Sequence, residues 1–225
     1  MIVLVDNTHN LRKAYMTPKL IKIIEDYTKK PLITLSNEDE VNKFILNNKE
    51  SEIHGFILSG GPLCLSDPNH IHMYKSNIQI MLNYPKIPVF GICFGFQVIV
   101  ECYGGKVSSI TDNKILKNKY FPERKGNLNC KKINDSFLIE GISETDKFKT
   151  FHSHKDIATK CPVFFKCFLR DSSGKIVEGI DSCFKNKNLG KRCGVQFHPE
   201  ANKKTHFIIK NFLDLCYKKN KDNNH

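Results

Sequence analysis

The cysteines of this chain lack the spacing that a metal site or a disulfide framework needs. Nine cysteines are scattered along 225 residues, and no C-x-x-C pair occurs. Because zinc sites and small disulfide-rich folds depend on closely spaced cysteines, we expect mostly buried free thiols and no bound metal. The first residues, MIVLVDN, also lack the basic segment of a signal peptide. We therefore expect a cytoplasmic protein in a reducing compartment.

Long apolar runs and arginines are scarce as well. No apolar stretch of the sequence reaches the roughly 18–20 residues that span a bilayer, so we expect no membrane partner. The net charge is +12, but only four of the 35 basic residues are arginines, the usual choice for bidentate recognition of bases and phosphates. The lysines are spread along the chain, which favours a solvated basic surface over a nucleic-acid site. A docking face for an acidic partner stays open.

The chain also lacks the common nucleotide-binding loops. No G-x-x-x-x-G-K-[ST] segment occurs. The segment Ser59-Gly60-Gly61 begins like the S-G-G-x-D-S loop of ATP pyrophosphatases, but Leu63 and Cys64 stand at the Asp and Ser positions. We therefore expect no ATP site and no cofactor.

The first half of the sequence alternates between strand and helix patterns. Short apolar runs predict strands, at residues 2–5, 31–35, 55–58 and 88–92. Helical spacing of apolar residues predicts helices between and after them, at residues 20–27, 41–46, 71–82 and from 93 to Gly104-Gly105. The alternation predicts an α/β fold with an open, mainly parallel sheet and helices on both faces.

The second half predicts additional antiparallel strands. Strand-like segments separated by turns follow Lys106, at residues 127–133, 147–152, 163–169 and 175–183. A last buried strand at 194–197 and an amphipathic helix at 203–217 close the pattern. No repeat or linker interrupts it, so we expect one domain over residues 1–217, followed by a polar, disordered tail over 218–225.

Gly91-Ile92-Cys93-Phe94-Gly95 has the form of a nucleophile elbow, with cysteine in place of serine. A nucleophile on a sharp turn from strand to helix has a strained backbone, and its close neighbours must lack side chains. The start of a helix favours thiolate over thiol, and the N–H of Phe94 is placed to stabilise an oxyanion. The alternative is a buried cysteine with a purely structural role.

A base for this nucleophile is expected at the end of the last strand, in the segment GVQFHPE at residues 194–200. His198 follows the strand and can accept the thiol proton and later protonate a leaving group. Glu200 lies two residues on, where a carboxylate can set the imidazole tautomer and stabilise its charged form. The pair could instead be ordinary loop residues, and His152 and His154 are rival candidates for the base.

Three segments together resemble the signature blocks of class I, triad-type glutamine amidotransferases. They are GICFGFQ (91–97), LSGGP (58–62) and GVQFHPE (194–200), and their order and spacing agree with the family over residues 1–217. Within the family, MIVLVDN and Ser153-His154-Lys155-Asp156 are most similar to the amidotransferase subunit or domain of GMP synthetases. The resemblance implies the flavodoxin-like fold of class I amidotransferases.

The resemblance also implies a role for each matching residue. Cys93 would attack the side-chain amide of L-glutamine and form a thioester, with His198 as acid and base and Glu200 orienting it. The N–H groups of Gly61 and Phe94 would form the oxyanion hole. Further substrate contacts are implied for Gly60, Gly61, Gln97, Ser153 and His154.

The family resemblance implies that the ammonia passes to a separate synthetase, such as an ATP pyrophosphatase subunit. Two alternatives remain at this stage. The same triad would serve a free-standing hydrolase of γ-glutamyl peptides or conjugates, with a wider pocket. A regulatory relative could also keep the fold without the activity.

Overall fold

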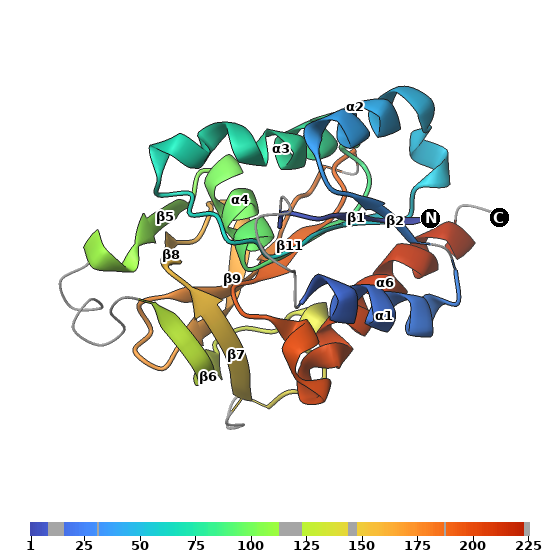
Figure 1. Ribbon diagram of the computed structural model, residues 1–225. Helices are drawn as coiled ribbons and strands as arrows, with labels where there is room; N and C mark the ends of the chain where they lie inside the picture. The colour runs from blue at the N-terminus through green and yellow to red at the C-terminus, as the bar shows by residue number, and fades with distance from the viewer. Residues whose placement is uncertain (9–15, 31, 113–122, 144–147, 187, 223–225) are drawn as a thin grey trace.

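The computed structural model describes residues 1–8, 16–30, 32–112, 123–143, 148–186 and 188–222 (Figure 1). Its strands are β1 (Ile2–Val5), β2 (Leu32–Leu35), β3 (Gly55–Leu58), β4 (Val89–Ile92), β5 (Lys106–Ser109), β6 (Arg124–Lys132), β7 (Phe148–His154), β8 (Asp156–Lys160), β9 (Phe165–Asp171), β10 (Val177–Ser182) and β11 (Arg192–Val195). The α-helices are α1 (Thr17–Thr28), α2 (Glu38–Asn47), α3 (Lys75–Asn83), α4 (Phe94–Cys102) and α6 (His206–Asp222). Short 3₁₀ helices are η1 (Glu50–Glu52), η2 (Pro68–Tyr74), η3 (Ile110–Asp112), η4 (Phe137–Ile139), η5 (Pro199–Ala201) and η6 (Lys203–Thr205).

The strands form one sheet with the order β2-β1-β3-β4-β11-β10-β9-β6-β7. The five strands from β2 to β11 pair in parallel. All residues of β1, β3, β4 and β11 are buried, as is typical of strands covered on both faces, whereas the edge strand β2 is only partly buried. From β10 onward every pairing along the sheet is antiparallel. The expected α/β fold, a mainly parallel sheet with added antiparallel strands, is confirmed.

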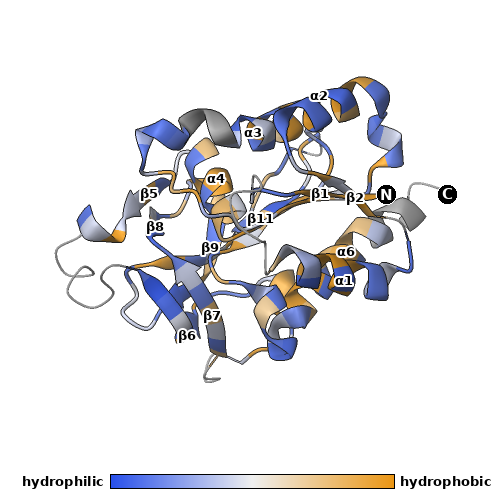
Figure 2. Ribbon diagram, in the orientation of Figure 1, coloured by the Kyte–Doolittle hydropathy of each residue, from blue (hydrophilic) through white to orange (hydrophobic). Residues whose placement is uncertain are grey.

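Helices cover both faces of the parallel strands, as α2, α3 and α4 lie on one side and α1 and α6 on the other (Figure 1). Each side has its own hydrophobic core, one including Val41 and Val98 and the other including Leu20 and Phe212. Apolar residues gather in the central strands and along α4 and α6, whereas α2 is largely hydrophilic (Figure 2). No helix in the described part of the chain is both long and apolar enough to cross a membrane.

The bounds of several elements differ from the sequence-based expectations by one to three residues, as for the last strand, which was expected at 194–197 and is β11. Three differences are larger. The strands β5 and β8 pair with each other and were not expected, because their short sequences have little apolar character and depend on tertiary pairing. The helix expected over residues 71–82 is 3₁₀ as far as Tyr74 and α-helical only from Lys75. The closing helix α6 continues to Asp222, five residues into the expected disordered tail, because an anchored helix propagates easily. Residue 31 and residues 223–225 lie outside the described residues.

Candidate active site

Cys93 lies on a strained turn between β4 and α4. Its backbone has φ 50° and ψ −101°, a region that a residue with a side chain rarely adopts. A hydrogen bond of 2.9 Å from its N–H to the carbonyl of Val195 holds the turn. A Cβ atom on Gly91 would lie 2.6 Å from the backbone of Gly95, and one on Gly95 would overlap the carbonyl of Leu58. The two glycines are therefore required by the close approach of the backbone.

The sheet brings three segments to one edge. The strands β3, β4 and β11 are parallel neighbours, with Leu58 opposite Gly91 and Ile92 opposite Val195. Because the carboxyl ends of parallel strands meet at the same edge, the loops that follow them are adjacent. A Cβ atom on Gly60 would lie 2.7 Å from His198 Cε1 and 3.4 Å from Cys93 Cβ. The loop after β3 thus contacts both the cysteine and the histidine.

His198 and Glu200 form a buried pair beside Cys93. The Nδ1 atom of His198 is 2.8 Å from Oε1 of Glu200. The backbone N–H of His198 donates to the carbonyl of Phe151 in β7, at 2.9 Å, and this bond fixes the start of the segment that carries both residues. Pro199 begins the 3₁₀ helix η5 directly afterwards, which turns the Glu200 side chain back toward the imidazole.

The pKa values separate His198 from its two rivals. Burial by itself lowers the pKa of His198, but its electrostatic interactions and hydrogen bonds with Cys93 and Glu200 raise it well above its usual value. Burial lowers the pKa of His154 to about 3 and the pKa of His152 well below its usual value. At neutral pH His198 is therefore the charged histidine of the three, and the other two are neutral.

A small cavity opens beside the Cys93 sulfur. It has a volume of about 150 Å³ and includes Cys93, Gly61, Phe94, Gln97, Ser153 and His154 in its lining. The backbone N–H groups of Gly61 and Phe94 donate to no other described residue. The sequence-predicted residues are thus brought together at one place, with Gly60 lying against the cysteine and histidine next to the cavity.

The sequence of the chain matches a known protein family and several named relatives. Residues 9–216 match the family described as Glutamine amidotransferase class-I. The chain belongs to this family. It is 31% identical to a separate subunit of the "GMP synthase [glutamine-hydrolyzing]" of Methanococcus aeolicus, covering 96% of this chain and 97% of the relative. The corresponding subunit from Methanocaldococcus jannaschii is 32% identical, with the same coverage.

Longer relatives and a solved structure complete the comparison. The "GMP synthase [glutamine-hydrolyzing]" of Dictyostelium discoideum is 33% identical over 76% of this chain, which spans only 22% of that relative. A crystal structure from Thermoplasma acidophilum, described as one subunit of a GMP synthase, superimposes with a TM-score of 0.71 at 18% identity, covering 100% of this chain and 97% of that one. This likeness supports the fold of the amidotransferase.

Two of the predicted substrate contacts are already engaged in this amidotransferase. The side-chain nitrogen of Gln97 donates to the backbone carbonyl of Asp156 at 3.0 Å and to Oε1 of Gln196 at 3.2 Å. Both ring nitrogens of His154 are used as well, Nδ1 with the carbonyl of Asp156 at 2.7 Å and Nε2 with His152 at 3.0 Å. Gln97 can therefore offer a ligand its carbonyl oxygen, whereas the ring of His154 has no free nitrogen.

Sequence reasoning missed one residue that the fold places at this site. Gln196 is fully buried, and its side-chain nitrogen lies 3.9 Å from the Cys93 sulfur. Its only signal was its position in the segment that supplies His198. His152 was considered as a rival base, but it lies behind His154 with its ring against Phe197. The alternation of Thr150, His152 and His154 along β7, which puts the three side chains on one face, could have indicated this.

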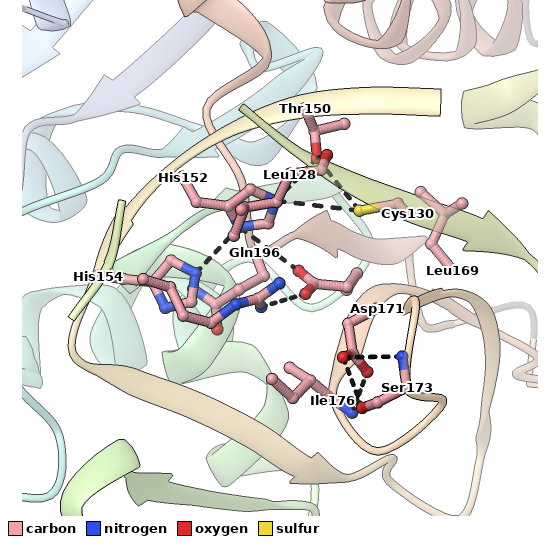
Figure 3. A network of polar contacts seen from close by, with 12 residues as sticks. Leu128, Cys130, Thr150, His152, His154, Leu169, Asp171, Ser173, Ile176 and Gln196 are labelled. Carbon is pink, nitrogen blue, oxygen red and sulfur yellow. Dashed lines mark hydrogen bonds and ion pairs between the residues drawn. The ribbon is translucent and has the colours of Figure 1, made fainter. Parts of the chain in front are cut away.

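Among the described residues one trio has the arrangement of metal ligands. The donor atoms of Cys130, His152 and Glu178 lie within 4.8 Å of one another, and all three residues are buried. Figure 3 shows Cys130 and His152 with their common neighbour Thr150. Each already has a partner, since Cys130 and His152 contact Thr150, and Glu178 forms an ion pair with Arg124. A cation here would also lie beside the Arg124 guanidinium, so this trio does not fit a metal ion.

Proposed function

We propose that this protein hydrolyses the side-chain amide of L-glutamine through a thioester on Cys93 and releases ammonia for a partner synthetase. The observation that carries the proposal is that Cys93, on its strained turn, lies beside the buried pair of His198 and Glu200. In that pair, His198 Nδ1 lies 2.8 Å from Glu200 Oε1. Nucleophile, base and orienting carboxylate are then assembled in the order that thiol-dependent acyl transfer requires.

In the first half of the reaction the Cys93 thiolate attacks the amide carbon of glutamine. The N–H groups of Gly61 and Phe94, which have no other described acceptor, stabilise the oxyanion. His198, kept protonated by its raised pKa, gives its proton to the amide nitrogen, and the C–N bond breaks to release ammonia. The products of this half are ammonia and a γ-glutamyl thioester.

In the second half a water molecule attacks the thioester. The neutral imidazole of His198 takes the proton of the water, while Glu200 holds Nδ1–H and stabilises the positive charge that forms. The C–S bond breaks, glutamate leaves, and the thiolate and imidazolium are restored. Gln97 would accept a hydrogen bond from the substrate through its side-chain oxygen, and Ser153 at the exposed side of the cavity would contact the amino-acid end.

The names of the relatives support a GMP synthetase assembly, in which a separate ATP pyrophosphatase subunit uses the ammonia. A groove of about 730 Å³ between α1 and α6 reaches Glu200. Its lining includes Asp26 and four lysines, Lys19, Lys22, Lys203 and Lys210. Such a groove suits an acidic surface of the partner. The nine free cysteines support action in the cytoplasm.

The size of the cavity favours glutamine over a γ-glutamyl peptide. About 150 Å³ is smaller than the roughly 300–1,000 Å³ of pockets that take larger ligands, and it suits a single amino acid. A non-catalytic role would leave the strain at Cys93 and the buried charged pair beside it without a purpose.

The test is covalent labelling followed by mutation. A glutamine-mimicking electrophile should add to Cys93, as located by mass spectrometry, and Cys93→Ala should abolish glutamate release while the circular dichroism spectrum is unchanged. Wild-type glutamate release by Cys93→Ala would reject the assignment. A charge reversal in the groove, Lys22→Glu, should weaken capture of the synthetase subunit from the same genome. The matched reversal at the exposed Lys131 on β6 should leave capture unchanged.

A further inference from the structure

Gln196 lies between the nucleophile and a chain of buried polar groups. Its backbone N–H donates to the carbonyl of Glu178 at 2.9 Å, which fixes the residue next to the end of β11. Its side-chain Oε1 faces Gln97 at 3.2 Å, and its Nε2 faces the Cys93 sulfur at 3.9 Å. The residue is completely buried, so its amide meets protein groups and not bulk water.

The orientation of the Gln196 amide follows from its neighbours. The backbone carbonyl of Asp156 can only accept, so the group of Gln97 that lies 3.0 Å from it must be the amide nitrogen. The second hydrogen of that nitrogen points to Gln196, which must present its oxygen there. The nitrogen of Gln196 is consequently the atom that faces the sulfur, and it approaches as a donor.

The same logic extends away from the site along β7 (Figure 3). His154 Nδ1 must donate to the Asp156 carbonyl, so its neutral ring accepts at Nε2, and the atom facing it, His152 Nδ1, must donate. His152 then accepts at Nε2, where the Thr150 hydroxyl donates at 2.8 Å, and the Cys130 thiol donates in turn to Thr150 at 3.1 Å. Burial raises the pKa of Cys130 well above its usual value, which keeps the thiol protonated as this arrangement requires.

The Asp156 carbonyl fixes the amide of Gln97, because an inverted amide would place two acceptors together there. An inverted amide at Gln196 would then place two donors together. We call the chain of hydrogen bonds from Cys130 through Thr150, His152, His154 and the Asp156 carbonyl the β7 relay. The β7 relay and Gln97 share the Asp156 carbonyl as their acceptor, and Gln97 orients Gln196.

We propose that Gln196 is a hydrogen-bond donor to the Cys93 sulfur, held in its donating orientation by Gln97 and the Asp156 carbonyl. The proposal rests on Cys93 being the nucleophile of the proposed function. Negative charge is present on this sulfur before attack and returns when the thioester breaks, and a donor aimed at the sulfur stabilises both states. A nitrogen 3.9 Å away is within reach of a sulfur acceptor, and hydrogen bonds at catalytic groups are often longer without substrate than with it.

The test measures the reactivity of Cys93 without glutamine, so that it is independent of whether the protein hydrolyses glutamine. Iodoacetamide labelling of the Cys93 peptide is followed by mass spectrometry as a function of pH. Gln196→Met removes the donor at nearly the same side-chain length. Half-maximal labelling should move about one pH unit higher, the effect of losing one hydrogen bond to a charged group, and labelling on the acidic side of the curve should fall about tenfold.

Two further measurements keep the proposal falsifiable. Gln196→Glu keeps an oxygen for Gln97 but puts a second oxygen against the sulfur, so labelling should fall at least as far as in Gln196→Met. If both variants fold and label Cys93 with the wild-type pH profile, Gln196 has only a structural role and the proposal is overturned. If neither folds, side-chain amide NMR of the full chain decides. The Gln196 NH₂ protons should shift on Cys93→Ala, and no shift would overturn the proposal.

Discussion

Replacing Glu200 by glutamine tests the electrostatics of the proposed catalytic pair, His198 and Glu200. The substitution keeps the shape of the side chain but removes the charge that lies 2.8 Å from His198 Nδ1 in a buried setting. A hydrogen bond between charged groups contributes about 1.5–3 kcal/mol. Since 1.36 kcal/mol corresponds to a factor of ten, the rate with glutamine should fall about 10- to 150-fold in Glu200→Gln.

The pH dependence gives the sign of the effect. The raised pKa of His198 means that the imidazolium persists to high pH in the wild type. Without the Glu200 charge this pKa falls, so the alkaline limb of the kcat/KM profile should move to lower pH. The acidic limb reports formation of the thiolate–imidazolium pair and should move less.

The assay is glutamate release from pH 5 to 10, with the synthetase partner present if the isolated chain is slow. The control is Glu140→Gln, which removes the same charge from an exposed residue remote in sequence from the triad and should leave the profile unchanged. An unchanged alkaline limb in Glu200→Gln, or a loss smaller than threefold, would refute the role given to this carboxylate.

Three other predictions follow from the same geometry. His198→Asn should lower turnover about 100- to 10,000-fold, the usual effect of losing a general acid and base, whereas His154→Asn should lower it far less. Equal losses of glutamate release in the two variants would mean that His198 is not the base. Gly60→Ala places a methyl group 2.7 Å from His198 Cε1 and should reduce kcat about 100-fold in a folded protein. The control is Gly174→Ala, whose Cβ meets nothing and which should cost about 1 kcal/mol of stability and no activity. A fully active Gly60→Ala would contradict the packing. Because the pKa of His154 is lowered to about 3, its contribution to stability is present above the unfolded value near 6.5 and is lost as the pH falls from there toward 3. Urea unfolding should show that His154→Gln loses about 1 kcal/mol less than the wild type between pH 6 and pH 5, and equal losses would argue against a buried neutral histidine.

Local patterns predicted the parallel half of the fold well. The strands β1, β3 and β4 are short apolar runs, and each is followed by polar or glycine-containing turn residues. The strands β5 and β8 escaped because Lys106–Ser109 and Asp156–Lys160 contain little apolar periodicity and are stabilised by pairing with each other. The extent of α6 was underestimated for a related reason, since packing of its first turns sustains a polar last turn.

For the candidate site, too, the sequence determined some features and only the tertiary structure determined others. The sequence by itself determined the elbow at Cys93, because glycines at 91 and 95 are needed wherever a backbone turns so sharply, and it determined the family. Only the tertiary structure decided which histidine is the charged one beside Cys93, since choosing among His152, His154 and His198 depends on burial and on neighbouring charge. Burial and neighbouring charge depend on which residues lie close together in space. The closeness of Cys93 and His198, about 100 positions apart, is set by the pairing of β4 with β11 and not by any local pattern.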